Sequence, residues 1–381
     1  MSRARVSAIV LAAGQGTRMR SRLPKPAHRL CGRPMVSYVL DALADVSVEK
    51  AVVVVGHGAE RVRASVLEHA PEAMDVVFAV QERQLGTGDA AAVGLEAFTA
   101  AELDDEDAVL VVMPGDTPLI RPATIASLVE AHTRDKAGAT LLTAHLHDPT
   151  GYGRVVRGKG GRVDRVVEQA DATDEEKAID EVNTSIYCFR RSLLAPALRR
   201  VTPTNAQGEY YLTDVVGVLR DAGYPIAAVP ADDPGETVGV NDRVQLAATE
   251  AALRSRTNRA WLQSGVTLVD PANTYIDTTV TLGEDVTVYP GSILRGATVI
   301  GSGAVIGPDT SLTDCVVGPG ARVERSSCTG ASIDAGARVG PYCHLEAGVR
   351  IGEGTVTGPF YAEAARARGG SGKGSLGLGP E

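Results

Sequence analysis

The sequence lacks most of the features that would assign it directly to a class of protein. Its five cysteines are scattered and never form a C-x-x-C pair, which argues against a zinc site or a disulfide framework and favours reduced thiols. No apolar run approaches the roughly eighteen residues of a membrane span, and residues 1–8 are too short for a signal peptide. A basic excess is also absent, because the formal net charge is −9, whereas nucleic-acid-binding surfaces are basic. We therefore expect a cytoplasmic protein whose partners include neither a membrane nor a nucleic acid.

The segment LAAGQGTRMRSRLPK at 11–25 lacks the markers of two common phosphate-binding loops. No GK[ST] follows its glycines, as a Walker loop requires, and the third glycine of the dinucleotide fingerprint is missing. It does contain Gly14 and Gly16, which let backbone N–H groups approach a ligand closely. Two cations, Arg18 and Lys25, follow them and suit a polyphosphate whose charge grows during a reaction. The alternative is a glycine turn with solvated arginines.

The first two-thirds of the 381 residues alternates short apolar runs with helical patterns, which predicts an α/β domain. The apolar runs lie at 6–13, 51–55, 75–80, 108–113 and 139–146. Continuous β-branched runs separated by amphipathic segments, such as 34–43, indicate a largely parallel sheet covered by helices. We predict a Rossmann-like, doubly wound domain whose ligands bind beyond the carboxyl ends of the strands.

The last third contains an internal repeat of six residues. Aliphatic residues recur at Leu282, Val288, Leu294, Ile300, Ile306 and Leu312, and again at Ile333, Val339, Leu345 and Ile351. This period is typical of hexapeptide repeats, which stack as coils of a parallel β-helix, and we expect a short left-handed one. The ten-residue interval between Val323 and Ile333 predicts a loop or an irregular coil.

Four parts follow from these patterns. We expect an α/β domain over 1–235, a linker segment at 236–265 whose helix covers 241–263, and the short β-helix over 266–358. The remaining 359–381 are expected to hold a cap, with a short helix at 360–367, and a disordered Gly-rich tail. An uncapped β-helix would otherwise oligomerise through its last coil.

Several segments together resemble a known family. They are LAAGQGTRMRSRLPK at 11–25, QERQLGTGDA at 81–90, PGDTPL at 114–119, DPTGYGR at 148–154, VEQADATDEE at 167–176, EVNTS at 181–185, NAQGEYYLTD at 205–214 and GVNDRVQL at 239–246. The first resembles the sugar-nucleotidyltransferase signature L-x-x-G-x-G-T-R-M-x-S-x-x-P-K. The set is similar to the family of bacterial bifunctional N-acetylglucosamine-1-phosphate uridylyltransferase/glucosamine-1-phosphate acetyltransferases over nearly the whole chain.

The resemblance implies a Mg²⁺-dependent reaction between UTP and N-acetylglucosamine 1-phosphate that yields UDP-N-acetylglucosamine and pyrophosphate. A phosphate dianion is already a nucleophile, so in-line attack on the α-phosphorus needs positioning and charge neutralisation rather than a general base. Arg18 and Lys25 would be the catalytic cations, and Asp116 and Asn241 would bind the metal. Taken alone, Asp116 is typical of a turn and Asn241 of a helix N-cap.

The resemblance also implies the residues that contact each substrate. For the nucleotide they are Leu11, Ala12, Ala13, Gly14, Gly16, Thr17, Gln81, Gln84, Gly86, Thr87 and Gly115. For the sugar they are Gly153, Glu168, Asn183, Tyr211 and Thr213. The Gln81 amide is expected to pair with both the imide N–H and a carbonyl of uracil.

Some residues depart from the family pattern. Asp89 stands where the family usually has histidine, and Ser185 where it has glycine, so the preference for sugar and nucleotide is open. In the second half, Glu346 stands where an arginine should bind phosphate, and His344 nearby is expected to be a solvated coil residue. The family's remaining acetyltransferase residues lie beyond the last residue of this sequence. We therefore expect no acetyltransferase activity and a β-helix that serves self-association, since the family forms trimers through it.

Two alternatives remain open at this point. One keeps the reaction but uses another sugar or cyclitol 1-phosphate, or another nucleoside triphosphate, in specialised metabolism; Asp89 and Ser185 favour it. The other is a regulatory protein that binds a sugar nucleotide without turning it over. Binding alone does not require all four of the expected catalytic and metal-binding residues, so their joint presence counts against the second alternative; they are Arg18, Lys25, Asp116 and Asn241.

Overall fold

The computed structural model describes residues 5–106 and 108–364. The chain forms two compact units that divide after Glu250. The division falls inside helix α9 (Arg243–Gln263), the helix expected at 241–263. The four-part division expected from the sequence stays a prediction. Within the described residues, no helix is both long enough and apolar enough to cross a membrane.

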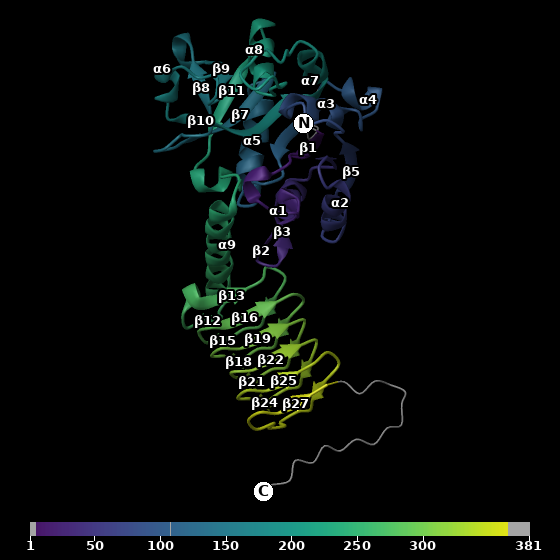
Figure 1. Ribbon diagram of the computed structural model, residues 1–381, viewed down its shortest axis with the longest axis vertical. Helices are drawn as coiled ribbons and strands as arrows, with labels where there is room; N and C mark the ends of the chain where they lie inside the picture. Colours follow the sequence, from purple (N-terminus) through teal and green to yellow (C-terminus); the bar gives the residue numbers. More distant parts are fainter. Residues whose placement is uncertain (1–4, 107, 365–381) are drawn as a thin grey trace. The chain divides into compact units, whose positions relative to one another are not determined.

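The first unit is built on a nine-stranded sheet whose main path runs β11-β7-β10-β6-β1-β4-β5 (Figure 1). Its strands are β1 (Val6–Ala12), β4 (Lys50–Val55), β5 (Asp75–Val80), β6 (Val109–Pro114), β7 (Ala139–His145), β8 (Gly153–Arg157), β9 (Val163–Val167), β10 (Glu181–Arg190) and β11 (Ile226–Pro230). The five expected runs are β1, β4, β5, β6 and β7, and β1 is parallel to both β4 and β6. The antiparallel β10, which pairs with β6 and β7, and the β8–β9 hairpin beside it were not foreseen.

Helices cover both faces of this sheet. They are α1 (Met35–Asp45), α2 (Ala59–Leu67), α3 (Thr87–Leu95), α4 (Ala100–Leu103), α5 (Pro122–Arg134), α6 (Asp174–Lys177), α7 (Arg191–Leu198) and α8 (Asp214–Asp221). The core under α1, α2 and α5 contains Val10 of β1, whereas the core under α3, α7 and α8 contains the preceding residue, Ile9. This alternation is expected of a strand buried on both faces.

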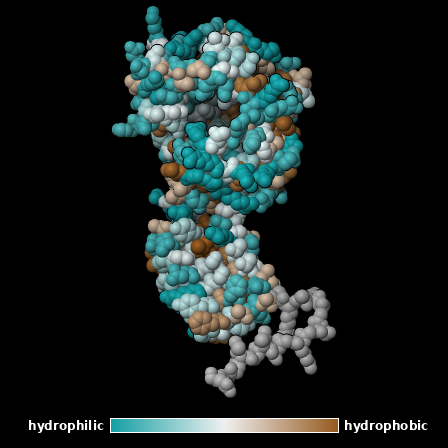
Figure 2. All heavy atoms as spheres, viewed as in Figure 1, coloured by the Kyte–Doolittle hydropathy of each residue, from teal (hydrophilic) through white to brown (hydrophobic). Residues whose placement is uncertain are grey.

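The sequence motifs leave this sheet at one edge. After β1 the chain forms two single-turn 3₁₀ helices, η1 (Thr17–Met19) and η2 (Lys25–Ala27), and then a small hairpin of β2 (Arg29–Leu30) and β3 (Arg33–Pro34). Strands β5 and β6 are parallel to β4 and β1 and so end at the same edge. In Figure 2 the visible face of this unit is largely hydrophilic, with apolar residues scattered over it.

The second unit is a three-sided parallel β-helix, as the hexapeptide period predicts (Figure 1). One side stacks β12 (Thr267–Leu268), β15 (Thr287–Val288), β18 (Val305–Ile306), β21 (Arg322–Val323) and β24 (Arg338–Val339). The second stacks β13 (Thr274–Ile276), β16 (Ser292–Arg295), β19 (Ser311–Thr313), β22 (Ser327–Thr329), β25 (His344–Leu345) and β27 (Ala362–Glu363). The third stacks β14 (Thr281–Leu282), β17 (Val299–Ile300), β20 (Val316–Val317), β23 (Ser332–Ile333) and β26 (Arg350–Ile351).

Two features of the β-helix differ from the expectation. The interval between Val323 and Ile333 is not a loop, because Cys328 in β22 occupies the inward position between them and is 1% exposed. Its spacing departs from the six-residue period, since Cys328 lies five residues from each of the two. At the C-terminal end, the expected helix at 360–367 is not formed in its described part, where β27 adds a strand to β25. The rest of that segment and the expected tail lie outside the described residues.

Candidate active site

Two glycines shape the loop after β1. Gly16 has a φ of 60°, and a side chain on it would place its Cβ 2.9 Å from the Cβ of Lys25. The positive φ favours glycine, because other residues are strained in this backbone region. The short distance to Lys25 leaves no room for a Cβ. At Gly14, in contrast, a Cβ would meet nothing within 4 Å. Gly16 therefore brings the Lys25 turn close, and Gly14 leaves the backbone open to a ligand.

Four polar side chains from distant parts of the sequence meet beside this loop. Arg18 Nη2 donates to Asn241 Oδ1 over 3.0 Å, and Lys25 Nζ donates to the same oxygen over 3.2 Å. Lys25 also forms an ion pair with Asp116, and these two side chains are only 17% and 14% exposed. Two cations and two oxygen ligands thus converge where β1 and β6 end.

Residues at the start of α9 hold this cluster together. The backbone N–H of Asn241 donates to Gln245 Oε1 over 2.7 Å. Arg243 Nε donates to the Met19 carbonyl of η1 over 3.2 Å, and its Nη1 lies 3.5 Å from Nδ1 of His28, which follows η2. Burial, followed by the charge of Arg243, lowers the pKa of His28 below its ordinary value. Arg243 therefore links both cation-bearing turns to the segment that carries Asn241.

A cavity of about 560 Å³ opens next to the loop. The expected nucleotide residues that line it are Leu11, Ala12, Ala13, Gly14, Gly16, Thr17, Gln81, Gln84, Gly86 and Thr87, together with Lys25 and Asp116. Gly115 is the one expected nucleotide residue that does not line this cavity. Its backbone N–H donates to the Leu11 carbonyl over 2.9 Å and so helps to hold the end of β1 in place.

Glycines also fix the loop between β5 and α3. Gly86 has a φ of 116°, and a Cβ on it would lie 2.5 Å from the Tyr210 carbonyl oxygen. That carbonyl accepts from the N–H of Gly88 over 2.7 Å. Thr87 Oγ1 accepts from the N–H of Leu212 over 3.0 Å. The loop that borders the nucleotide cavity is therefore bound to the segment at 209–213.

A second cavity, of about 270 Å³, holds most of the expected sugar residues. It is lined by Gly153, Glu168 and Asn183, together with Arg18, Asp116 and Asn241. Thr213 does not line it but donates to Glu168 Oε1 over 3.1 Å. Tyr211 is buried and lies outside both cavity linings. The two cavities share Pro114, Asp116 and Ser185, so they meet beside the cation cluster.

The sugar cavity perturbs its ionisable groups. Burial, with the neighbouring Asp214, Asp171 and Glu209 carboxylates, raises the pKa of Glu168, although the hydrogen bond from Thr213 opposes this shift. Next to this cavity but outside its lining, Tyr211 has its pKa raised to about 12 by burial and Asp171. Perturbed groups in a cleft are typical of functional sites, which supports the placement of this one.

Sequence reasoning missed several residues that line the two cavities. Tyr152 lies within the DPTGYGR motif but received no role; it lines the sugar cavity, and burial and Asp116 raise its pKa. Glu209 lines the nucleotide cavity, and Gln245 lines the sugar cavity four residues after Asn241. All three belong to matched motifs, so their position in the motifs was the available signal.

The residues at the shared edge suit a magnesium ion that also binds phosphate. Asp116 offers a carboxylate and Asn241 an amide oxygen, both hard ligands. Across the described residues, no group of three or more His, Cys, Asp or Glu could hold a metal by itself. Two protein oxygens leave coordination positions for phosphate and water, as Mg²⁺ sites in phosphoryl-transfer enzymes do.

Comparison with known proteins agrees with this geometry. A family model described as "Nucleotidyl transferase" matches residues 7–262, so the chain belongs to this family and is a nucleotidyltransferase. Within it, the chain belongs with proteins named "Bifunctional protein GlmU". That of Brevibacillus brevis is 45% identical over 93% of this chain and 75% of the relative. Those of Streptomyces coelicolor and Mycolicibacterium gilvum are 47% and 46% identical over 92% of this chain, covering 72% and 70% of the relatives.

Proposed function

We propose that the chain transfers the uridylyl group of UTP to N-acetylglucosamine 1-phosphate, giving UDP-N-acetylglucosamine and pyrophosphate with Mg²⁺ as cofactor. The observation that carries this proposal is the meeting of two cavities at Asp116. One cavity is bordered by the glycine loop and its cations, and the other by Glu168 and Asn183. Such an arrangement suits a nucleotide and a sugar phosphate that react at the shared edge.

The residues of the site account for the main requirements of this reaction. Bound at Asp116 and Asn241, Mg²⁺ would neutralise charge on the phosphate oxygens. Lys25 contacts both of these side chains and Arg18 contacts Asn241, so both cations are within reach of phosphate oxygens and can stabilise charge on the leaving pyrophosphate. The sugar phosphate is itself the nucleophile, so the site works by positioning and charge stabilisation without a general base.

Pyrophosphate release tests this function. We expect release with UTP and N-acetylglucosamine 1-phosphate in the presence of Mg²⁺ and its loss with EDTA. Asp116→Asn should lower kcat by about a hundredfold or more, because it removes the carboxylate from the shared edge. Asp135→Asn is a matched control, since Asp135 is an exposed carboxylate that pairs with Arg134 at the end of α5. Full turnover by Asp116→Asn would refute its role.

A second candidate keeps the reaction but changes the acceptor. Ser185 lines both cavities and is exposed, so its hydroxymethyl group borders the acceptor as well as the nucleotide. A panel of hexosamine, hexose and cyclitol 1-phosphates, each with four nucleoside triphosphates, separates the two candidates by kcat/KM. If no pair releases pyrophosphate, a binding protein without turnover is the better description.

For the second unit we propose self-association rather than acetyl transfer. Glu346 and His344 are exposed at one end of the β-helix, where a carboxylate does not suit a phosphate ligand. On another side, Val299 and Val316 are register neighbours and are 43% and 53% exposed, as a buried trimer contact would require. Sedimentation should give a trimer, and incubation with glucosamine 1-phosphate and acetyl-CoA should give no acetylated product. Cys188, Cys315, Cys328 and Cys343 are buried free thiols, which suits the proposed cytoplasmic location.

A further inference from the structure

The side chain of Gln81 is held in one orientation at the nucleotide cavity. It follows β5 directly and is 3% exposed. Its Nε2 donates to the Gly86 carbonyl over 3.2 Å and to Asp89 Oδ2 over 2.7 Å. A primary amide has two N–H hydrogens, and both partners here are acceptors only. Both hydrogens are therefore used, and the nitrogen rather than the oxygen must face Asp89.

This orientation leaves Gln81 with one free polar atom. Within 5–106 and 108–364, no donor contacts its Oε1, and Gln81 lines the nucleotide cavity. The amide was expected to pair with both an N–H and a carbonyl of the base, but in this orientation it can pair only with an N–H. Gln81 can accept a hydrogen bond from a nucleobase, but it has no N–H left to donate.

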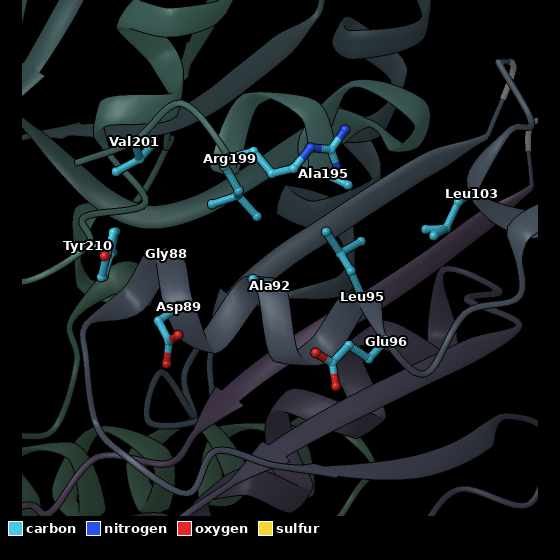
Figure 3. A pocket seen from close by; sticks show the side chains of 11 residues that line it. Gly88, Asp89, Ala92, Leu95, Glu96, Leu103, Ala195, Arg199, Val201 and Tyr210 are labelled. Atoms are coloured by element: carbon cyan, nitrogen blue, oxygen red, sulfur yellow. The ribbon is translucent and has the colours of Figure 1, made fainter. Parts of the chain in front are cut away.

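Asp89 is placed firmly enough to impose this choice. It lies in the first turn of α3, where the helix dipole stabilises a carboxylate. The preceding Gly88 is bound to the Tyr210 carbonyl, and Figure 3 shows Asp89 beside Gly88 at one end of α3, with Glu96 at the other. The histidine usual in the related family could donate or accept, so it would not add to the constraint set by the Gly86 carbonyl as a carboxylate does.

We propose that Asp89 is a positioning residue that turns Gln81 Oε1 toward the base and so selects uracil over cytosine. The imide N3–H of uracil can donate to this oxygen, whereas N3 of cytosine is an acceptor and meets it with repulsion. The proposal rests on the proposed function only in that the cavity binds a pyrimidine nucleoside triphosphate. Asp89 acts through Gln81 and needs no contact with the nucleotide.

Equilibrium binding of UTP and CTP in the presence of Mg²⁺ tests the proposal. The wild-type protein should bind UTP more tightly than CTP. In Asp89→Asn, the new amide can donate to Oε1 of a flipped Gln81, in exchange for the longer, 3.2 Å bond to the Gly86 carbonyl. The flipped Gln81 then offers its N–H to cytosine. We expect the ratio of the two dissociation constants to fall by about tenfold, the range that one mispaired buried group produces. Glu96→Gln, at the other end of α3, should leave the ratio unchanged.

A double variant shows whether Asp89 acts through Gln81. In a Gln81→Ala background, Asp89→Asn should leave the UTP-to-CTP ratio unchanged, because there is no amide to orient. Thermal melting confirms that each variant is folded. Three results would overturn the proposal: equal affinity of the wild-type protein for UTP and CTP, an unchanged UTP-to-CTP ratio in folded Asp89→Asn, or a UTP-to-CTP ratio in the double variant that differs from that of Gln81→Ala. Absence of pyrophosphate release would remove the proposed function but not the binding result.

Discussion

At the scale of single residues, Ser185 is under backbone strain at the edge shared by the two cavities. Its φ is 62°, a left-handed conformation, and β10 has an irregular register between Asn183 and Tyr187 at this point. A non-glycine residue is destabilised there, because its Cβ crowds the following carbonyl. This strain explains why the family usually has glycine at this position, and it means that Ser185 lowers the stability of the folded protein.

Ser185→Gly should therefore raise the free energy of unfolding by about 1 kcal/mol, since it removes this strain. Denaturant unfolding followed by circular dichroism measures the change. Ser192→Gly is the control, because Ser192 lies within α7, where glycine should destabilise by about 1 kcal/mol. A loss of stability in Ser185→Gly would contradict the account.

Glu168 gives a pH-dependent prediction at the same scale. Its pKa is raised in the folded protein, mainly by burial, so the folded state binds more protons than the unfolded state between the two pKa values. Stability should fall as pH rises from the unfolded value, near 4.5, through the folded one. Glu168→Gln removes this ionisation and its cost in the folded state. The difference in unfolding free energy between the variant and wild type should therefore be more favourable to the variant at pH 7 than at pH 4.

Unfolding free energies of the two proteins across this pH range measure the difference. Glu175→Gln provides the comparison, because Glu175 is exposed on α6. If the gain of Glu168→Gln were the same at both pH values, the raised pKa would be wrong. A confirmed result would mean that the sugar cavity keeps an ionisable carboxylate at the expense of stability, as expected of a group that binds substrate hydroxyls.

At the scale of elements, sequence periodicity predicted the repeating coils of the β-helix. It missed features that depend on contacts between distant parts of the chain. The inward aliphatic residues of the β-helix were predicted because each coil repeats the same burial. Cys328 was missed because cysteine at a core position breaks the aliphatic pattern while packing equally well. The antiparallel β10 was missed because its direction is set by tertiary pairing with β6 and β7. The orientation of Gln81 was missed because it depends on Asp89, eight residues away.

The two 3₁₀ turns that carry Arg18 and Lys25 give a prediction at this scale. Arg243 contacts both turns, through the Met19 carbonyl and His28. Arg243→Met keeps an unbranched apolar stem but removes these contacts, so the cations should lose their common position. We expect kcat/KM for the nucleotide to fall by about tenfold, equivalent to about 1.4 kcal/mol. Arg259→Met on the exposed side of α9 should have no such effect, and equal losses in both variants would contradict the role of Arg243.

At the scale of the whole molecule, the chain contains separate hydrophobic cores. Two lie on the faces of the nine-stranded sheet, and the third is formed by the coils of the β-helix between Val266 and Ile351. The β-helix core shares no residue with the other two. Cooperative unfolding requires shared packing, so the β-helix core should not unfold together with the two sheet cores, which share the same strands. The residues proposed to be catalytic, Arg18 and Lys25, belong to the first unit.

Calorimetry should therefore show two unfolding transitions, one for the sheet with its two cores and one for the β-helix core. Leu40 and Leu312 are fully buried, in the sheet core and the β-helix core respectively, and replacing either with alanine should destabilise its own core by about 2–5 kcal/mol. Leu312→Ala should lower one transition temperature and leave nucleotidyl transfer intact at 25 °C, whereas Leu40→Ala should lower the other together with the temperature at which activity is lost. A single transition displaced by both substitutions would show instead that the two units unfold as one cooperative structure.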